Sequence, residues 1–211
     1  TASLAIERAA GTAVGVPMEL DGEDLDLRAI DIDGTALAAG EGYALGAKEG
    51  LTLLSPPAGD KFTLTTTVAI KPQENTQLSG LYKSSGNYVT QCEAEGFRRI
   101  TYYLDRPDVM AKFTKVRVEA DKAAYPILLS NGNRVSAGDV GDGARHEAVF
   151  EDPYPKPSYL FALVAGDLGR VSGAFTTASG RAVELNVYSE KENVDQCDHA
   201  LASLVKAMTW D

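Results

Sequence analysis

Histidine, serine and glycine are the residues whose spacing most readily reveals a catalytic site, and here they form none of the common motifs. The chain has two histidines, His146 and His199. A zinc site of the His-Glu-x-x-His type needs a second histidine at position 150, where this sequence has Phe150. The glycine-rich residues 138–143 lack the Lys-Ser/Thr ending of a phosphate-binding loop, and no Gly-x-Ser-x-Gly elbow occurs. A Ser/His/Asp triad assembled from distant positions stays open, because such residues need only meet in space.

Residues 80–110 differ from the rest of the chain, because they are dense in Tyr, Gln, Cys, Glu and Arg and lack clean alternation. We expect loops and short strands there, and loops held by a rigid scaffold often carry function. Two acids, Glu93 and Glu95, stand in this stretch of an acidic chain, so solvation at the surface is their default interpretation. Ion pairing and packing are the default interpretation for Arg98, Arg99, Tyr102, Tyr103, Asp105 and Arg106.

Most of the chain has the alternation of half-buried strands. Residues 25–33 alternate with one shift of phase at Ala29, and the Asp-Gly pair at 33–34 predicts a hairpin turn. Turns are also expected at 56–57, 131–133, 138–143 and 179–180. Further strands are expected at 62–70, 116–120, 127–129, 148–150, 159–165 and 183–188. Short strands separated this often predict an all-β antiparallel sandwich rather than βαβ units.

One helix is expected at the end of the sequence. After Asn193 the apolar residues fall at helical spacing, at 197, 201, 204, 205 and 208. Asn193 is the expected N-cap, and Gln196 completes a capping box.

Charge and cysteine content exclude some classes of partner and structure. The formal net charge of −10 disfavours nucleic acid, because an acidic surface repels phosphates. Two cysteines far apart, Cys92 and Cys197, predict reduced thiols, with a single long-range disulfide as the alternative. No apolar run approaches the ~20 residues of a membrane span, and the first residues lack the pattern of a signal peptide.

Long runs of residues match a known family in order and spacing from residue 80 to the end, and the match weakens before residue 65. The runs are 80–86, 90–98, 100–109, 125–126, 128–133, 152–157, 159–166 and 208–211. In these runs the chain resembles the amino-terminal domain of the aminopeptidase N (alanyl aminopeptidase) family of zinc metallopeptidases, in its bacterial and plastid-like branch.

The resemblance implies a saddle-like antiparallel β-sandwich with one C-terminal helix. Residues 1–192 would form the sandwich, and residues 193–211 a helix leading toward a catalytic domain that is absent from this sequence. The family's catalytic domain carries His-Glu-x-x-His, a downstream glutamate ligand and a Gly-x-Met-Glu-Asn motif, none of which occurs here. We therefore expect no catalytic residue, metal ligand or cofactor in this chain, and zinc only in the missing catalytic domain.

One family role carries over residue by residue. In the family, the loop matching Gln91-Cys92-Glu93-Ala94-Glu95 reaches into the active site, and by that match Gln91 and Glu93 would contact the free α-amine of the substrate. A fixed carboxylate attracts a cationic amine, and an amide oxygen completes its hydrogen bonds. Such an anchor positions the peptide for cleavage of its first bond and breaks no bond itself.

Two functions stay open at this point. In the first, the chain is the substrate-anchoring part of a zinc aminopeptidase, and its partner is a peptide amino terminus. In the second, it is a stand-alone structural or interaction subunit, whose apolar face is covered by a protein partner in a larger assembly. In both we expect no peptidase activity from these 211 residues alone. A soluble intracellular or organellar location is favoured over secretion, and the compartment itself is unknown.

Overall fold

The alternating residues 25–33 form strand β3 (Asp26–Ile32), which pairs antiparallel with β7 (Lys61–Ala69). The shift of phase in the sequence is a β-bulge, because the register with β7 slips just before Ala29. Arg28 and Ala29 are consequently both exposed, and Ile30 returns to the buried side. The bulge therefore preserves the apolar face of the strand despite the break in alternation.

The hairpin turn predicted at 33–34 is confirmed. Asp33 and Gly34 have φ angles of 51° and 81°, which is the pair of positive values that a type I′ turn requires. The turn leads into β4 (Thr35–Ala36), whose first residue pairs with the last residue of β3. This two-residue connection sets the register of β4 against β3.

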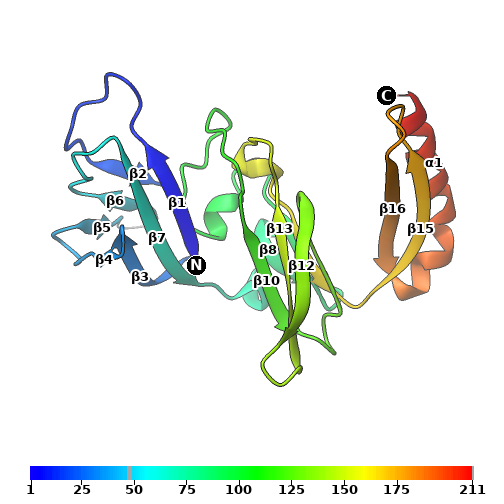
Figure 1. The fold of residues 1–211 in the computed structure, drawn as a ribbon. Coiled ribbons are helices and arrows are strands. Elements are labelled where there is room, and N and C mark those ends of the chain that lie inside the picture. The colour runs from blue at the N-terminus through cyan, green and yellow to red at the C-terminus, as the bar shows by residue number, and fades with distance from the viewer. Residues whose placement is uncertain (47–48, 211) are drawn as a thin grey trace.

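The computed structural model describes residues 1–46 and 49–210 and arranges them as pairs of facing sheets (Figure 1). The first pair consists of a sheet in the order β1-β7-β3-β4 and a sheet in the order β2-β6-β5. Its remaining strands are β1 (Ala2–Glu7), β2 (Met18–Leu20), β5 (Tyr43–Leu45) and β6 (Leu51–Leu53).

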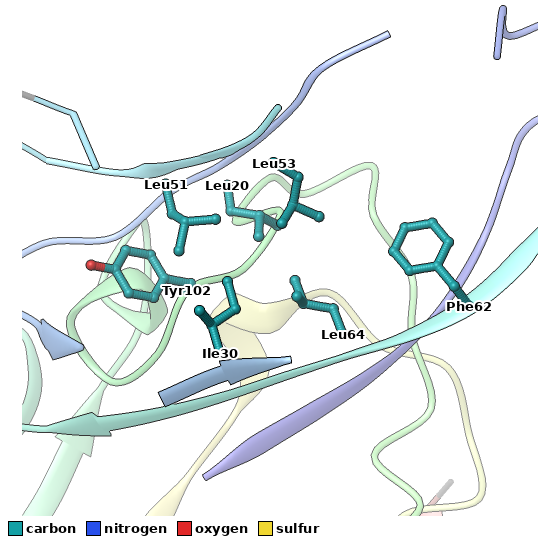
Figure 2. Close-up of a cluster of buried hydrophobic side chains, with 7 residues drawn as sticks. All are labelled: Leu20, Ile30, Leu51, Leu53, Phe62, Leu64 and Tyr102. Atoms are coloured by element: carbon teal, nitrogen blue, oxygen red, sulfur yellow. The ribbon is translucent and has the colours of Figure 1, made fainter. Parts of the chain in front are cut away.

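Apolar side chains from these two sheets fill the space between them (Figure 2). Leu53 and Leu64 are fully buried, and Tyr102 enters the cluster from outside both sheets. Burial of such side chains is the main favourable term in folding, at about 1.5–3 kcal/mol for each large apolar group. The complete cluster is Leu20, Ile30, Leu51, Leu53, Phe62, Leu64 and Tyr102.

A second pair of sheets follows along the chain and has its own core of Val118, Leu128, Ala148, Phe150 and Ala165. One sheet has the order β10-β13-β12 and the other β11-β14-β9-β8. Their strands are β8 (Gly80–Ser84), β9 (Asn87–Gln91), β10 (Val116–Asp121), β11 (Ile127–Ser130), β12 (Asn133–Val140), β13 (Arg145–Glu151) and β14 (Leu163–Gly166). Short 3₁₀ helices η1 (Pro72–Glu74), η2 (Phe97–Arg99) and η3 (Ser158–Leu160) lie in the connections.

A third apolar cluster joins the two pairs of sheets. It consists of Cys92, Phe97, Tyr103 and Phe161, and Phe97 contacts both aromatic rings edge-on at centroid distances of 5.0 and 5.1 Å. Leu4 of β1 packs against both this cluster and the core of the first pair. The connection between β9 and β10 therefore supplies the contact between two separate cores.

The end of the chain forms a unit of its own kind, a hairpin covered by a helix. Strands β15 (Leu168–Thr176) and β16 (Ala182–Glu190) pair along their whole length, and η4 (Lys191–Gln196) and α1 (Asp198–Trp210) contact them. The helix lies along the hairpin at one side of the molecule (Figure 1). Gly173 leaves room for this packing, because a methyl group there would come within 3.2 Å of the Leu201 side chain.

Three local predictions were wrong in their boundaries. Residues 158–160 are a 3₁₀ turn after Pro157 rather than the start of a strand, and β14 begins at 163. The turn expected from 138 begins after β12 ends at Val140. The capping box at Asn193 does not form, because η4 packs Val194 against β15 and the Asn193 amide accepts a bond from Gln196 instead.

The predicted fold class is confirmed. The strands pair antiparallel in several sheets, and α1 is the one α-helix in residues 1–46 and 49–210. None of the helices in these two ranges combines the length and the apolar character that crossing a bilayer would require. Both cysteines are free thiols, as expected, and Cys92 is buried.

Replacement of Leu64 by alanine is expected to lower the free energy of unfolding by about 2–5 kcal/mol, because it opens a cavity at a fully buried position. Leu160→Ala is the matched control, since that side chain is 50% exposed, and its expected effect is about 0.5 kcal/mol or less. Urea unfolding of the purified chain measures both. Equal losses in the two variants would contradict the assignment of the core.

Candidate functional site

Gln91 and Glu93 lie where β9 ends and the chain turns toward η2. Both side chains are exposed, and Cys92 between them is buried. The Gln91 side-chain amide donates a hydrogen bond to the backbone oxygen of Glu93 at 3.1 Å. This bond uses the amide nitrogen, so the amide oxygen of Gln91 and the exposed carboxylate of Glu93 remain as acceptors.

A single backbone hydrogen bond closes the loop that carries these residues. The Gly96 amide donates to the Cys92 carbonyl at 2.8 Å, and the Glu93–Ala94 peptide bond inside the loop is cis. Gly96 is buried where three stretches of backbone meet. A methyl group at this position would lie 2.4 Å from the Gln91 carbonyl oxygen and 2.8 Å from the Gly80 nitrogen. The loop therefore requires a residue without Cβ at position 96.

Cys92 anchors the loop to the protein interior, because its side chain packs in the aromatic cluster of Phe97, Tyr103 and Phe161. Burial raises the pKa of its thiol to about 12, and the charge of Asp105 acts in the same direction. The thiol is therefore neutral near pH 7 and serves as a small apolar group. Its role is to direct the side chains on either side of it, Gln91 and Glu93, toward solvent.

A buried ion pair follows directly after the loop. The Arg98 guanidinium donates from Nε to the Asp105 carboxylate at 3.0 Å and from Nη2 to the Asp105 backbone oxygen at 3.0 Å. The Asp105 side chain is 1% exposed and that of Arg98 is 20% exposed. Burial by itself would lower the pKa of Arg98, but the hydrogen bond to Asp105 and the charges of Asp21, Asp105 and Glu95 outweigh it and raise the pKa.

Arg99 ties the same segment to the first pair of sheets. Its guanidinium forms ion pairs with Glu23 and Asp24, and the backbone of Glu23 donates to the Arg98 carbonyl at 3.0 Å. Asp21 and Tyr103 exchange two backbone hydrogen bonds at 2.8 and 3.0 Å. The prediction of structural ion pairs in this region is therefore confirmed, with Arg106 in an exposed pair to Asp108.

The two acids of the loop have different surroundings. The Glu95 carboxylate lies 3.6 Å from the Arg98 guanidinium, which also pairs with Asp21 and Asp105. Over the described ranges of the chain, the salt bridges include none to Glu93. An exposed carboxylate without a cationic neighbour, next to an amide oxygen, has the composition of a binding site for an ammonium group.

One surface groove has neither Gln91 nor Glu93 in its lining. It has a volume of about 640 Å³, and Tyr102 and Arg99 form part of its wall. Charges of both signs line it, including Asp26, Arg28 and Lys71. Because it contains neither Gln91 nor Glu93, and its lining holds no histidine, cysteine or serine, we do not assign the candidate site to it.

The two histidines do not meet. His146 lies on β13 with its Nε2 2.8 Å from the Tyr125 carbonyl oxygen, and His199 lies on α1. Within residues 1–46 and 49–210, no three His, Cys, Asp or Glu side chains are grouped so that they could hold a metal ion. These residues therefore do not fit a zinc site.

Lys156 is a feature whose burial the sequence did not predict. The residue stands between two prolines, its side chain is 8% exposed, and its ammonium group lies 2.8 Å from the Asp152 carboxylate. The ammonium group also lies 3.9 Å from the centre of the Phe113 ring. Its backbone exchanges two hydrogen bonds with Ala111, so it joins the β9–β10 connection to the loop before η3.

Comparison with known proteins gives a consistent result. A model of the peptidase M1 N-terminal domain matches residues 29–160. The aminopeptidase N of Caulobacter vibrioides is 51% identical over the whole of this chain, and that of Escherichia coli is 48% identical over 94% of it. The chain spans 23% and 22% of the lengths of these two relatives.

Solved structures agree with this result. The aminopeptidase A of Legionella pneumophila, in complex with aspartic acid, superposes with a TM-score of 0.90 and 35% identity over 99% of this chain and 24% of that protein. An M1 zinc metallopeptidase of Deinococcus radiodurans, bound to a Tyr-Ser-Ala substrate, superposes with a TM-score of 0.71 over 90% of this chain and 42% of that protein. At 18% identity the second likeness concerns the fold alone.

Gly96→Ala is expected to destabilise the chain by about 1–3 kcal/mol, because the added methyl group would overlap the backbones of Gln91 and Gly80. Gly138→Ala is the matched control, because a methyl group on that β12 residue meets nothing within 4 Å. Urea unfolding midpoints measure both changes. A Gly96→Ala variant as stable as the control would show that the loop does not need its glycine.

Alkylation by iodoacetamide at pH 8 is expected to modify Cys197 roughly a hundredfold faster than Cys92. Cys92 is buried, and its raised pKa keeps it in the unreactive thiol form at this pH. Mass spectrometry of peptides after timed quenching measures the two rates. In a Cys197→Ser variant the remaining thiol should stay unmodified until denaturant is added. Rapid labelling of native Cys92 would contradict its placement.

Proposed function

The chain belongs to the peptidase M1 N-terminal domain family, and from that premise we propose that it anchors the free amino terminus of a peptide in a zinc aminopeptidase. In this proposal the chain is the non-catalytic amino-terminal part of the enzyme. The observation that carries it is the exposed Glu93 carboxylate, which has no ion pair in the described part of the chain and belongs to a residue whose backbone oxygen accepts a hydrogen bond from the Gln91 amide.

The chemistry of the two side chains suits this ligand. An α-ammonium group has three donors, which the Glu93 carboxylate and the Gln91 amide oxygen can accept together. Neither group is a nucleophile or base placed against a second reactive side chain, so the site binds and orients and does not cleave. A peptide held by its amino terminus presents its first bond at a fixed distance from the anchor, which would confine cleavage to that bond.

The relatives support the anchoring function over a stand-alone structural subunit. The Caulobacter vibrioides, Escherichia coli and Legionella pneumophila proteins are aminopeptidases, and this chain matches about a quarter or less of their lengths. The Legionella pneumophila protein is in complex with aspartic acid, an amino acid with the free α-amine that the proposed anchor would recognise. Charge also fits, because a net charge of −10 attracts a cationic amine.

The described residues of this chain include no group of side chains that could hold zinc, so the proposed function assigns the metal no role in this chain. The metal belongs to the proposal only as a property of the Deinococcus radiodurans zinc metallopeptidase of the same fold. The part of the reaction assigned here is the recognition of the substrate amine.

We also propose that the boundary between the sandwich and the following unit lies near residue 167 rather than at 193. Helix α1 packs on β15 and β16, and Lys191 pairs with Asp167 at 2.6 Å, so residues 167–210 close on themselves. The match to the N-terminal domain model ends at residue 160, before this unit begins. A boundary at 193 would separate the helix from the hairpin that it covers.

Glu93→Gln in the full-length enzyme is expected to lower kcat/KM for L-alanine p-nitroanilide by about 10- to 100-fold, the usual worth of a charge-assisted hydrogen bond. Glu95→Gln is the control from the same loop, because its exposed contact to Arg98 contributes little, and a change of less than about threefold is expected. Steady-state kinetics measure both. Equal, small effects of the two substitutions would refute the anchoring role of Glu93.

A further inference from the structure

The anchor loop has few contacts of its own that could hold it in place. Within it, one backbone bond joins Gly96 to Cys92 and one side-chain bond joins Gln91 to Glu93. The side chains of Gln91 and Glu93 are exposed. Cys92 holds the start of the loop in the apolar cluster, and beyond that contact the orientation of Gln91 and Glu93 depends on η2, the segment that follows, and on the groups that hold η2.

Asp105 is the group that holds η2. Its carboxylate accepts hydrogen bonds from the backbone nitrogen of Arg98 at 3.1 Å, from Nε of Arg98 at 3.0 Å and from the hydroxyl of Ser158. Its backbone nitrogen donates to the Asp21 carboxylate at 3.0 Å. The side chain, which is 1% exposed, thus links η2 to η3, and the backbone of the same residue adds a link to Asp21 at the end of β2.

The contacts to Arg98 and Ser158 need the carboxylate in its observed place. Three donors converge on its two oxygens, so it acts as an acceptor only. Asparagine has the same shape but loses the charge, and its amide nitrogen would face one of these donors. The remaining carboxylates near the Arg98 guanidinium, which is 20% exposed, would then be those of Asp21 at 3.7 Å and Glu95 at 3.6 Å. Because Glu95 is in the loop, Arg98 would be drawn toward the loop.

We propose that Asp105 is a positioning residue for the amine anchor, because it holds Arg98 and η2 so that Gln91 and Glu93 face the substrate in a fixed orientation. The proposal rests on the anchoring function proposed above. Asp105 touches no substrate in this scheme and acts through the loop. Displacement of a positioning group by about 1 Å is enough to cost roughly 100-fold in rate.

The test is a double-mutant cycle in the full-length enzyme with L-alanine p-nitroanilide as the probe. Asp105→Asn alone is expected to lower kcat/KM by about 10- to 100-fold. In a variant that already carries Glu93→Gln, the same substitution should cost less than about threefold, because the anchor that it positions is already impaired. If Asp105 had a purely structural role, its substitution would lower kcat/KM by the same factor with and without Glu93→Gln.

Asp108→Asn is the matched control, because this acid is three residues away, 70% exposed and in a surface pair with Arg106. Its expected change in kcat/KM is less than about twofold.

If Asp105→Asn yields no folded enzyme, Ser158→Ala replaces it in the cycle, since it removes one donor to Asp105 and keeps the charge pair. If Asp105→Asn lowers kcat/KM by the same factor with and without Glu93→Gln, the positioning role is overturned. The anchoring function still stands in that case, provided that Glu93→Gln alone lowers kcat/KM. A Glu93→Gln enzyme with unchanged kcat/KM overturns the anchoring function itself.

Discussion

The carboxylate of Asp105 is the constraint on which the arrangement of the candidate site depends. It is buried, and it joins η2 to η3 while its own backbone is held by Asp21. Without it, the β9–β10 connection would lose the polar link between η2 and η3 and would keep the ion pairs of Arg99, the backbone bonds of Tyr103 and the apolar cluster. Apolar contacts are not directional, so they set how closely the segments approach but not the angle at which a loop leaves them.

A buried ion pair is a costly way to gain stability, since both charges lose water, and replacement by apolar residues is often neutral. Geometry is what such a pair adds. Arg98 presents a rigid, planar fork, and here the fork reaches both the carboxylate and the backbone oxygen of Asp105. Lys156 is a second buried cation, fixed by Asp152 and the face of Phe113, and it holds the same connection further along. Two buried charge pairs therefore brace a segment that has little regular secondary structure.

Local patterns in the sequence were sufficient for several elements. The alternation over residues 25–33 predicted strand β3, in which the phase shift at Ala29 is a bulge, and the Asp33-Gly34 pair predicted its turn, because both signals act over a few residues. The failures have long-range causes. The capping box at Asn193 was lost to the packing of Val194 against β15, and the burial of Lys156 requires Asp152 and Phe113 to be brought together by folding. The roles of Gln91 and Glu93 came from resemblance, since spacing alone indicated only solvated polar groups.

Charge pairing separates two acids that the sequence presents as equivalent. Glu93 and Glu95 are both exposed and stand two residues apart, yet Glu95 lies against Arg98, and no salt bridge to Glu93 is present over the described ranges. An acid that already neutralises a structural cation has less to gain from a second cation, because its charge is partly compensated before the ligand arrives. A carboxylate without such a partner keeps its full attraction for an ammonium group. The same network that holds the loop therefore also leaves Glu93, rather than Glu95, as the acid that the proposed anchor would use for a substrate amine.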